Sequence, residues 1–288
     1  MRNEYKNLNY KYALPEQRPQ MLKDWFRERT GGGNLDLDNP KTFNEKIQWI
    51  KLNDIDDLKT KLTDKYEVRD WVKDKIGEQY LIPLLGVYDR PEEINWDELP
   101  HEFIIKCNHG CKWNIIVKDK NTIDRSVVNN SLHRWLQTTY GINGFELQYY
   151  KIKPKIIIEK KIENEGHDDL FDYKIWCFGG RPEFIQFSLD RHHGGLKHAM
   201  FDVHWEKQPY TYHHPMTEKD IEKPSNLDEM LQIAKKLSDG FRFVRVDLYR
   251  LNDGAIYFGE MTFTPECGIG EWFGKDMGIE YGNLIKLT

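Results

Sequence analysis

The sequence predicts a mixed fold of the α+β or α/β class. Helical patterns fill much of the first third of the chain, short apolar strands alternate with helical patterns after residue 100, and a strand–turn–strand pattern lies near the C-terminal end. Such alternation is typical of domains in which helices cover a sheet. Hydrophobic residues make up 39% of the 288 residues and charged residues 31%, as in a soluble globular protein.

The net charge and the length of the apolar runs argue against nucleic-acid binding and against a transmembrane helix. The formal net charge of −5 gives no reason to expect a nucleic-acid partner. No apolar run reaches the roughly 20 residues that a transmembrane helix needs, and the first residues, 1–6, are polar. The four cysteines fit a reducing compartment and no disulfide framework. We therefore expect a cytoplasmic protein without a transmembrane segment.

Two helix starts can be identified in the first third. Thr42 and Glu45 have the spacing of a capping box, in which each side chain bonds to the backbone N–H of the other residue. Asp64 and Glu67 repeat this spacing before a second amphipathic pattern that ends at Gly77. Both positions therefore predict helices.

The chain is expected to divide into three parts. Residues 1–100 form an N-terminal helical region, in which the loop-rich stretch 83–100 serves as a linker. A small central lobe spans 101–165 and a C-terminal lobe 166–288. The predicted elements after the linker are, in order, strands at 103–107 and 115–117, a helix at 127–140, a strand at 155–159, a hairpin at 173–189 with its turn at Gly179-Gly180, and a helix at 225–240.

Residues 245–262 predict a second hairpin that carries facing carboxylates. Asp253-Gly254 supplies the positive φ angles of a two-residue type I′ turn. With that turn, Asp247 stands directly opposite Glu260. Two like charges at such a position destabilise a sheet, so a neutralising partner is expected.

The partner is expected on the same face of the hairpin. Arg245 stands opposite Thr262, and alternation of side chains along a strand places both on the face of Asp247 and Glu260. A divalent cation with oxygen ligands is the simplest partner for the two carboxylates. The alternative is that Arg245 alone neutralises them in a structural ion pair.

Charged residues at strand ends are further candidates. Lys106 ends an apolar strand, and the polar loop 109–114 with Lys112 follows it. A lysine beside loop amides can hold phosphate oxygens; the alternative is an edge-strand lysine in solvent. Glu159 ends another apolar strand, where a carboxylate can accept from an exocyclic amine of a base or simply emerge into water.

Two basic residues lie farther along. Lys174 alternates with apolar neighbours on a strand, which can turn it toward a cleft. Arg191 lies in a polar, glycine-flanked loop that either binds an anion or is a solvated turn. Neither a G-x-x-x-x-G-K-[ST] phosphate loop nor a nucleophile elbow is found, and the Cys107–Cys111 spacing is not that of a zinc ribbon.

Several segments together resemble the TupA-like family of the ATP-grasp superfamily. The segments that carry the resemblance are Thr42-Phe43-Asn44-Glu45-Lys46, Asp64-Lys65-Tyr66-Glu67-Val68-Arg69, Phe103-Ile104-Ile105-Lys106-Cys107-Asn108-His109-Gly110, Asp172-Tyr173-Lys174, Arg245-Val246-Asp247-Leu248-Tyr249 and Phe258-Gly259-Glu260-Met261-Thr262. The resemblance covers about residues 40–288. It implies an ATP-grasp fold, in which two α+β lobes clasp ATP after an N-terminal helical region.

The resemblance implies roles for individual residues. Lys106 and Arg69 contact the phosphates, beneath a lid formed by 109–114. The residues that it places at the nucleotide are Arg69, Lys106, Lys112, Glu159, Lys161, Ile162 and Asp172, with Glu159, Lys161 and Ile162 at the adenine and Asp172 at the ribose.

The resemblance likewise assigns a metal site and a catalytic group. Asp247 and Glu260 correspond to magnesium ligands, with Thr262 where many superfamily members have asparagine. Arg245 corresponds to an arginine that stabilises the reacting oxyanion, and Lys174 and Arg191 are the further catalytic candidates.

The function that follows is an ATP- and Mg²⁺-dependent carboxylate–amine ligase, with Mn²⁺ as an alternative metal. The resemblance implies that it acts through an acyl phosphate in bacterial surface-polysaccharide synthesis. A uronic acid, glycan or peptide carboxylate and an amine are the expected partners, with lipid-linked glycans or nucleotide sugars as alternatives and recruitment to the inner face of the membrane left open. An ATP-dependent sugar kinase, a glycosyltransferase and a glycan-binding module are the alternative functions.

Overall fold

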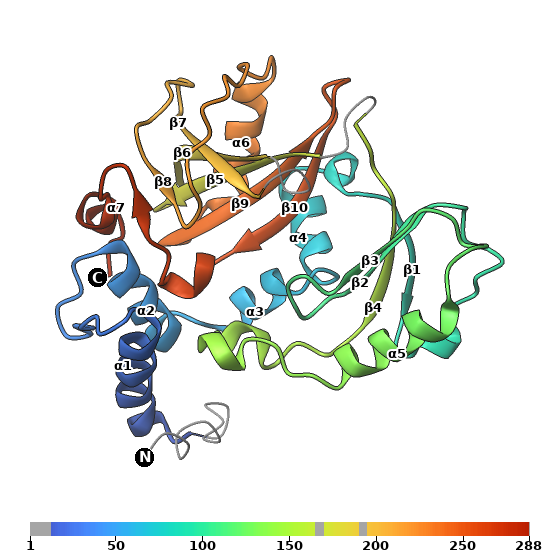
Figure 1. Ribbon diagram of the computed structural model, residues 1–288, viewed down its shortest axis with the longest axis horizontal. Coiled ribbons are helices and arrows are strands. Elements are labelled where there is room, and N and C mark those ends of the chain that lie inside the picture. The colour runs from blue at the N-terminus through green and yellow to red at the C-terminus, as the bar shows by residue number, and fades with distance from the viewer. Residues whose placement is uncertain (1–12, 165–169, 190–194, 288) are drawn as a thin grey trace.

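The computed structural model describes residues 13–164, 170–189 and 195–287, and two antiparallel sheets organise them (Figure 1). The four-stranded sheet has the order β1 (Leu84–Tyr88), β4 (Ile156–Lys160), β2 (Phe103–Cys107), β3 (Asn114–Val117). The five-stranded sheet has the order β10 (Ile256–Thr262), β9 (Phe243–Arg250), β5 (Phe171–Phe178), β6 (Arg181–Leu189), β7 (Lys197–Asp202). A third, small sheet pairs β8 (Thr211–Tyr212) with β11 (Trp272–Phe273).

Seven α-helices and several 3₁₀ turns surround these sheets in the described residues. The α-helices are α1 (Arg18–Arg29), α2 (Phe43–Asn53), α3 (Asp57–Thr63), α4 (Val68–Lys75), α5 (Arg125–Leu136), α6 (Leu227–Ser238) and α7 (Gly278–Leu284). The 3₁₀ turns are η3 (Pro15–Gln17), η4 (Glu78–Tyr80), η5 (Pro91–Glu93), η6 (Ile142–Gly144), η7 (Leu147–Tyr149) and η8 (Pro265–Gly268). The mixed class that the sequence predicts is therefore confirmed.

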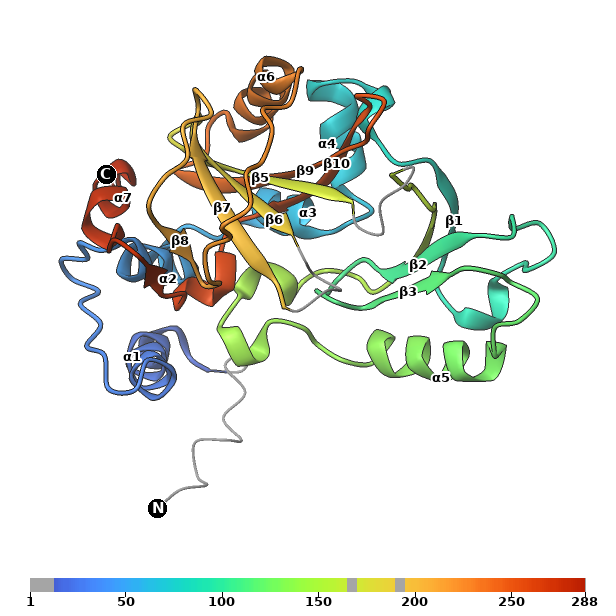
Figure 2. The same ribbon diagram turned by 45° about the horizontal axis from the view of Figure 1, so that its top comes forward.

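Helix α5 covers one face of the four-stranded sheet (Figure 2). Val128 and Leu132 of this helix are buried in one cluster with Phe103 and Ile105 of β2. Alternate residues of β2 point to this side because side chains alternate along a strand. The predicted strands and helix of the central lobe are thus confirmed, although the helix begins at Arg125 and ends at Leu136.

Both faces of the five-stranded sheet carry apolar clusters. Helix α6 packs on one face, where Ile175 and Val246 lie in the largest apolar cluster. On the other face, aromatic side chains such as Trp176 pack against α2 and α7. The predicted hairpin of β5 and β6 is confirmed, and both Gly179 and Gly180 have the positive φ that its turn requires.

The stretch expected as a linker contributes to the four-stranded sheet. Within residues 83–100, β1 pairs antiparallel with β4 from Leu84↔Glu159 to Tyr88↔Ile156. A linker interpretation of 83–100 is therefore wrong for this part, because polar loops flank a five-residue strand whose partner lies some 70 residues later in the chain. The division at residues 100 and 165 stays a prediction.

The first capping box is confirmed and the second is altered. Thr42 Oγ1 accepts from the N–H of Glu45, and Glu45 Oε2 accepts from the N–H of Thr42. Asp64 instead accepts from the N–H groups of Tyr66 and Glu67, so it closes a turn, and α4 begins only after that turn.

The turn of the C-terminal hairpin differs from the predicted one. Leu251 donates to Ala255 O, and Gly254 donates to Leu251 O with φ +89°. The loop therefore has three residues and ends on a left-handed glycine, which is the alternative to a two-residue type I′ turn.

A β-bulge then restores the predicted pairing at the site. The register shifts between Phe258 and Glu260, and Glu260 consequently lies opposite Asp247, as predicted. Glycine suits the bulge because a Cβ on Gly259 would lie 3.0 Å from the carbonyl oxygen of Asp247.

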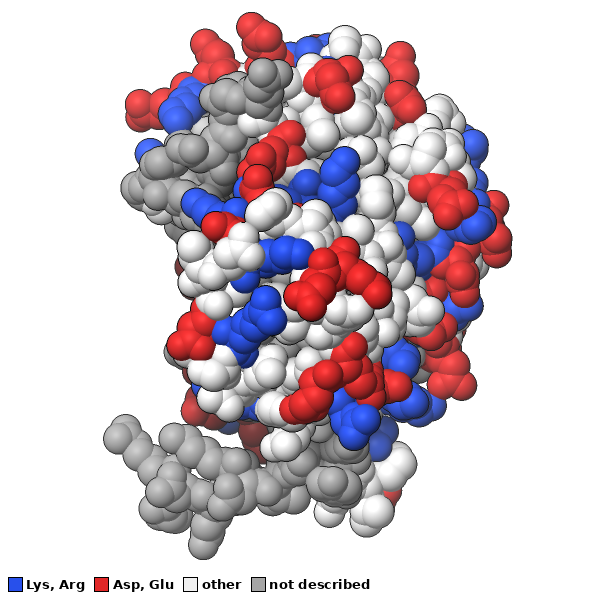
Figure 3. All heavy atoms as spheres, turned by 90° about the vertical axis from the view of Figure 1, so that its right-hand side faces the viewer, with Lys and Arg blue, Asp and Glu red and all other residues white. Residues whose placement is uncertain are grey.

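Charges of both signs mix on the surface. Figure 3 shows basic and acidic side chains next to one another over the face that it presents. Such mixing limits the field that this face projects through salt solution. No helix of the described residues is both long and apolar enough to span a membrane.

Candidate active site

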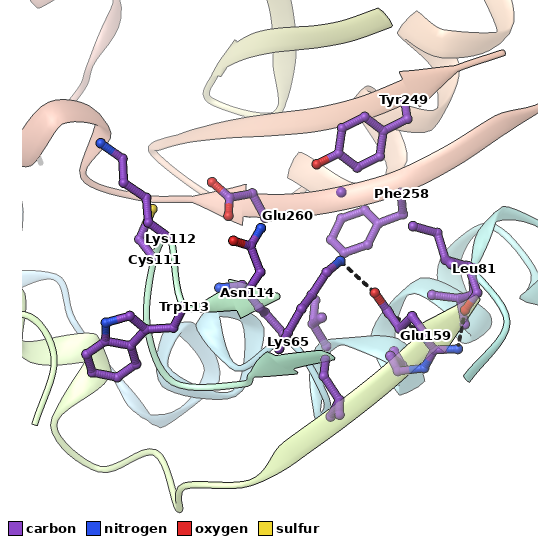
Figure 4. A pocket seen from close by; sticks show the side chains of 16 residues that line it. Lys65, Leu81, Cys111, Lys112, Trp113, Asn114, Glu159, Tyr249, Phe258 and Glu260 are labelled. Carbon is purple, nitrogen blue, oxygen red and sulfur yellow. Dashed lines mark hydrogen bonds and ion pairs between the residues drawn. The ribbon is translucent and has the colours of Figure 1, made fainter. Parts of the chain in front are cut away.

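A pocket opens between the two sheets (Figure 4). The residues that line it are Lys65, Val68, Arg69, Leu81, Ile82, Lys106, Cys111, Lys112, Trp113, Asn114, Ile157, Glu159, Tyr249, Phe258, Gly259 and Glu260. One wall comes from the five-stranded sheet, and the other comes from the four-stranded sheet and α4. We call these the hairpin wall and the cation wall.

The hairpin wall carries a compact network of one guanidinium and two carboxylates. Arg245 contacts Asp247 twice, with Nε–Oδ1 and Nη2–Oδ2 distances of 2.7 Å. Its Nη2 also lies 3.1 Å from Thr262 Oγ1 and 3.4 Å from Glu260 Oε1. The four residues that the sequence places on one face of the hairpin are thus brought together.

Asp247 is closed off from the pocket. Besides the bidentate contact with Arg245, its Oδ2 lies 2.7 Å from Lys174 Nζ, and Lys174 is also paired with Asp172. The side chain of Asp247 is only 4% exposed. Lys174 reaches this position because it pairs with Asp247 in the register of β5 and β9. Asp247 therefore behaves mainly as a buried ion-pair partner in this arrangement.

Glu260 is the open carboxylate of the pair. Its side chain is 38% exposed and lines the pocket. Removal from bulk water opposes its charge, but Lys65, Arg245 and Lys174 outweigh this effect and lower the pKa of Glu260 to about 2. Glu260 is therefore ionised at neutral pH and presents an oxygen ligand to the pocket.

On the cation wall, Glu159 gathers two basic groups. Glu159 lies 2.6 Å from Lys106 Nζ through Oε2 and 3.1 Å from Arg69 Nη1 through Oε1. Arg69 also donates to Ile82 O. Lys106 and Arg69 thus line the pocket as the resemblance implies, whereas the carboxylate of Glu159 is already engaged by both of them.

Lys65 is a pocket residue that the sequence reasoning did not single out. Its Nζ donates to Gly110 O at 2.7 Å, and its backbone N–H donates to Asn108 O. Its charge is the largest influence that lowers the pKa of Glu260. The available signal was its place in the segment Asp64–Arg69, where only Arg69 was given a role.

The loop expected as a flexible lid makes polar and aromatic contacts with α5 and the chain that follows it. His109 Nε2 lies 3.1 Å from Trp135 O, and the rings of Trp113 and Trp135 stack at 6.3 Å. Lys112, which lines the pocket, has a positive φ of 61°. In this conformation aromatic packing and the contacts to Lys65 place the loop along the rim of the pocket, and its role as a flexible lid stays a prediction.

Three predicted nucleotide residues do not line the pocket. Lys161 is paired with Glu102 and Glu163, and Ile162 is buried. Asp172 is paired with Lys174, and it lies opposite the pocket residue Tyr249 in the register of β5 and β9. Arg191 lies outside the described residues. Lys161 and Ile162 follow the last residue of β4, and a strand pattern gives no direction for side chains beyond the last residue that pairs.

The pocket also has an apolar end that sequence reasoning missed. Leu81, Ile82 and Phe258 line it together with Val68 and Ile157. In the sequence these residues are indistinguishable from core residues, because only the tertiary arrangement leaves their surfaces beside a pocket.

The residues present suit a nucleotide with a bound divalent cation. The apolar end suits a base. Phosphate oxygens suit the basic side chains of Lys65, Arg69, Lys106 and Lys112. Glu260 supplies a hard oxygen ligand for a metal next to the Thr262 hydroxyl. Among the described residues no group of three or more His, Cys, Asp and Glu side chains converges on one point. Phosphate oxygens and water would therefore have to complete the coordination of a metal.

A family model described as TupA-like ATPgrasp matches residues 45–286. The chain belongs to the TupA-like ATP-grasp family. The match covers most of the chain and confirms the resemblance that the sequence motifs carry. A comparison with curated proteins gives no match.

Solved structures similar to this TupA-like chain include two ligases and a synthase. D-alanine–D-alanine ligase from Bacillus anthracis complexed with ATP is 18% identical, with a TM-score of 0.41, and the match covers 70% of this chain and 53% of that chain. L-amino acid ligase from Bacillus licheniformis is 12% identical, with a TM-score of 0.46 and coverage of 90% and 55%. N5-carboxyaminoimidazole synthase from Aspergillus clavatus, in complex with ADP and 5-aminoimidazole ribonucleotide, is 12% identical, with a TM-score of 0.40. The match covers 70% of this chain and 44% of that chain. This chain matches about half the length of these proteins.

Proposed function

We propose that this chain is an ATP- and Mg²⁺-dependent ligase that joins a carboxylate to an amine. The observation that supports it best is the opposition of four cationic side chains to Glu260 across one pocket with an apolar end. Triphosphate chemistry needs this combination, because catalysis of phosphoryl transfer rests on positioning and on neutralising charge. Membership of the TupA-like ATP-grasp family supports the same proposal.

In the proposed reaction the two walls have separate tasks. Lys65, Lys106 and Arg69 neutralise the phosphates, and the apolar end holds the base. Glu260, with the Thr262 hydroxyl, holds Mg²⁺, which when bound neutralises phosphate oxygens and draws electron density from the transferring group. An oxygen of the substrate carboxylate attacks the γ-phosphorus, the bond to the β–γ bridging oxygen breaks and ADP leaves. The neutral amine then attacks the carbonyl carbon of the acyl phosphate, phosphate leaves, and the nitrogen gives up a proton to solvent as the amide forms.

Arg245 has a positioning task and an electrostatic task. Burial opposes its charge, but Asp247 and Glu260 raise its pKa above the ordinary value, so it stays a cation. A fixed guanidinium beside the pocket stabilises the oxyanion that forms when the amine attacks. Its bidentate contact with Asp247 fixes the plane of the guanidinium before substrates arrive.

In this proposal Asp247 orients the side chains of Arg245 and Lys174 through its ion pairs with them. Direct coordination of Mg²⁺ by Asp247, as the resemblance implies, requires an oxygen to leave Lys174 or Arg245. The ion pair with Lys174 then determines whether an oxygen of Asp247 is free to bind the metal. We include Asp247 as a metal ligand of the loaded state and Glu260 as the ligand already turned to the pocket.

The finer part of the proposal concerns the substrates. We propose a uronic acid, glycan or peptide carboxylate and an amine or amino acid, within the synthesis of a bacterial surface polysaccharide. Its support is what the resemblance of the sequence motifs to the TupA-like family implies.

A screen of substrates tests the proposal. Purified protein is incubated with ATP, Mg²⁺ and uronic acids crossed with amino acids and amines, ADP release is recorded, and products are weighed by mass spectrometry. An amide product with ADP supports the ligase; a phosphorylated sugar without amide indicates a kinase. ADP release that persists unchanged in Glu260→Gln would contradict the assignment, and Glu280→Gln on the surface of α7 is the matched control.

A further inference from the structure

A second groove lies at the end of the molecule that carries α1, α2 and α7. Figures 1 and 2 show these helices on the side away from the four-stranded sheet. The residues that line this groove are Phe26, Asn34, Thr42, Asn44, Glu45, Gly270, Glu271, Trp272, Asp276 and Gly278. None of them lines the pocket between the hairpin wall and the cation wall. The groove has a volume of about 490 Å³, which suits a small organic ligand.

A closed cycle of three hydrogen bonds holds one wall of the second groove. Asn44 Nδ2 donates to Gly270 O at 2.9 Å, and the N–H of Gly270 donates to Tyr212 Oη at 3.0 Å. The Tyr212 hydroxyl donates in turn to Asn44 Oδ1 at 2.8 Å. Glycine is required in this cycle, because a Cβ at position 270 would lie 2.3 Å from Tyr212 Cζ. The cycle ties α2 to the segment 270–278, so this wall is formed before a ligand arrives.

Trp272 gives the second groove an aromatic surface and an unused hydrogen-bond donor. Packing on Tyr212 and Tyr281 fixes its ring, with centroid distances of 4.9 and 5.4 Å. The indole Nε1–H is buried and finds no acceptor among the described residues. Nε1 lies 3.8 Å from the position that a Cβ on Gly278 would take, so the glycine leaves this edge of the indole next to the groove. A buried donor without an acceptor is unfavourable, and a ligand hydroxyl that accepts from it removes this cost.

The polar groups of the second groove are amides and carboxylates, and no Lys, Arg or His lines it. Glu45 and Asp276 each use one oxygen to accept from backbone N–H groups of their own segments, which leaves the other oxygen. Glu271 and Asn34 are exposed, and neither side chain has a hydrogen bond or ion pair to another described residue. The groove therefore offers oxygen acceptors, amide and indole donors and negative charge that no protein cation in it neutralises.

We propose that this groove binds an amino sugar, a pyranose ring that carries a protonated amine. The C–H face of a pyranose packs on aromatic side chains. Its hydroxyls donate to carboxylate oxygens and accept from the indole and from the amide of Asn34, and its ammonium forms charge-assisted hydrogen bonds to Glu271 and its neighbours. A uronic acid or a phosphate is unsuited, since no cation of the groove offsets its charge. The inference goes beyond the ligase function and does not depend on it.

Calorimetric titration of the full-length protein with D-glucosamine, a trimer of D-glucosamine, D-glucose and D-glucuronic acid tests this assignment, at a slightly acidic pH that protonates the sugar amine. D-Glucosamine is expected to bind at least tenfold more tightly than D-glucose, which lacks the ammonium. D-Glucuronic acid is expected not to bind. Tighter binding of the trimer than of the monomer indicates a sugar chain as the ligand, and equal binding indicates the free sugar. The proposal is overturned if D-glucosamine does not bind or binds no more tightly than D-glucuronic acid.

Variants of the lining residues locate the bound sugar. Glu271→Gln keeps the volume and removes an unpaired charge, and it is expected to weaken D-glucosamine binding at least fivefold. Trp272→Phe keeps a ring and removes the indole N–H, with an expected loss of at least threefold. Glu280→Gln is the matched control, because Glu280 is an exposed glutamate of α7 that does not line the groove.

Thermal unfolding of each variant shows whether it is folded. Glu271 is exposed and has no partner among the described residues, so Glu271→Gln is expected to unfold at the wild-type temperature. If wild type and Glu271→Gln bind D-glucosamine equally, the sugar lies elsewhere and the assignment is overturned. An equal loss of binding in Glu271→Gln and Glu280→Gln would also overturn it, because the effect would then not come from the groove.

Discussion

The two walls of the pocket are built in different ways. The hairpin wall is local, since Arg245, Asp247, Glu260 and Thr262 lie within 18 consecutive residues of one hairpin. The cation wall is assembled from distant segments, and its central ion pairs join Glu159 to residues 53 and 90 positions away. The difference teaches that a site can be half predictable from sequence when one half is a hairpin and the other depends on tertiary packing.

The largest expected effect is on stability and concerns the hairpin wall. Asp247→Ala leaves Arg245 and Lys174 buried without their shared carboxylate, which costs about 3–5 kcal/mol of unfolding free energy. Urea denaturation measures this loss. Asp228→Ala at the start of α6 is the control and is expected to change stability by less than about 1 kcal/mol. Equal losses in the two variants would mean that the network contributes no special stability.

The buried Lys51, whose Nζ donates to Gly144 O and Cys267 O, predicts a pH dependence. Because burial lowers the pKa of Lys51 from 10.5 to about 8, the folded chain loses this proton before the unfolded chain does. Stability attributable to Lys51 therefore rises between pH 8 and 10.5, by at most roughly 3 kcal/mol, and is flat below pH 8. The measurement is the difference in unfolding free energy between wild type and Lys51→Met at pH 7 and pH 10. If the difference in unfolding free energy is the same at pH 7 and pH 10, the pKa of Lys51 is not lowered by burial and this prediction is contradicted.

The cation wall is expected to affect ligand binding more than stability. Lys106→Ala removes one charged partner of the phosphates, and ATP binding should weaken roughly 10- to 100-fold, since hydrogen bonds to charged groups contribute about 1.5–3 kcal/mol. Calorimetry with ATP and Mg²⁺ measures the change. Lys118→Ala, just after β3 on the same sheet, is the control. Equal affinities for ATP in the two variants would remove Lys106 from the phosphate site.

The smallest expected effect tests how the hairpin sets its register. Gly254 has φ +89° with open space around it, so Gly254→Ala meets only backbone strain and should cost about 1–2 kcal/mol. Gly254→Asn should cost less, because asparagine tolerates the left-handed region. Thermal unfolding of both variants gives the comparison. Equal stability of wild type and Gly254→Ala would show that the loop does not need its left-handed residue.

The pairing of carboxylates on the hairpin wall could be predicted from the sequence because side chains alternate along a strand. It could also be predicted because a bulge offsets the error in the predicted turn. Strand alternation and a turn near residue 253 suffice to pair Asp247 with Glu260. The turn itself was wrong by one residue, and the bulge at Gly259 restores the pairing. Neither the three-residue loop nor the bulge follows from alternation alone, because both depend on local backbone choices that glycine permits.

The cation wall could be predicted only in part. Lys106 and Arg69 were identified through the family motifs, whereas the role of Glu159 in pairing both was not, since it depends on the order of β4 and β2 in the sheet. Lys65 was missed because its contact to Gly110 joins segments 45 residues apart. The flexible lid expected at 109–114 stays a prediction; the packing of Trp113 on Trp135 in this conformation did not follow from the sequence. Long-range packing of this kind leaves no periodic signal in a sequence.

The central claim is that Glu260 holds a metal between the two walls of a nucleotide site. Its most direct test is the Mg²⁺ dependence of ATP binding, measured by calorimetry for wild type and for Glu260→Gln, which preserves volume and removes the charge. The account predicts that Mg²⁺ strengthens ATP binding at least tenfold in the wild type and has little effect in the variant. The same Mg²⁺ dependence in both proteins would contradict it.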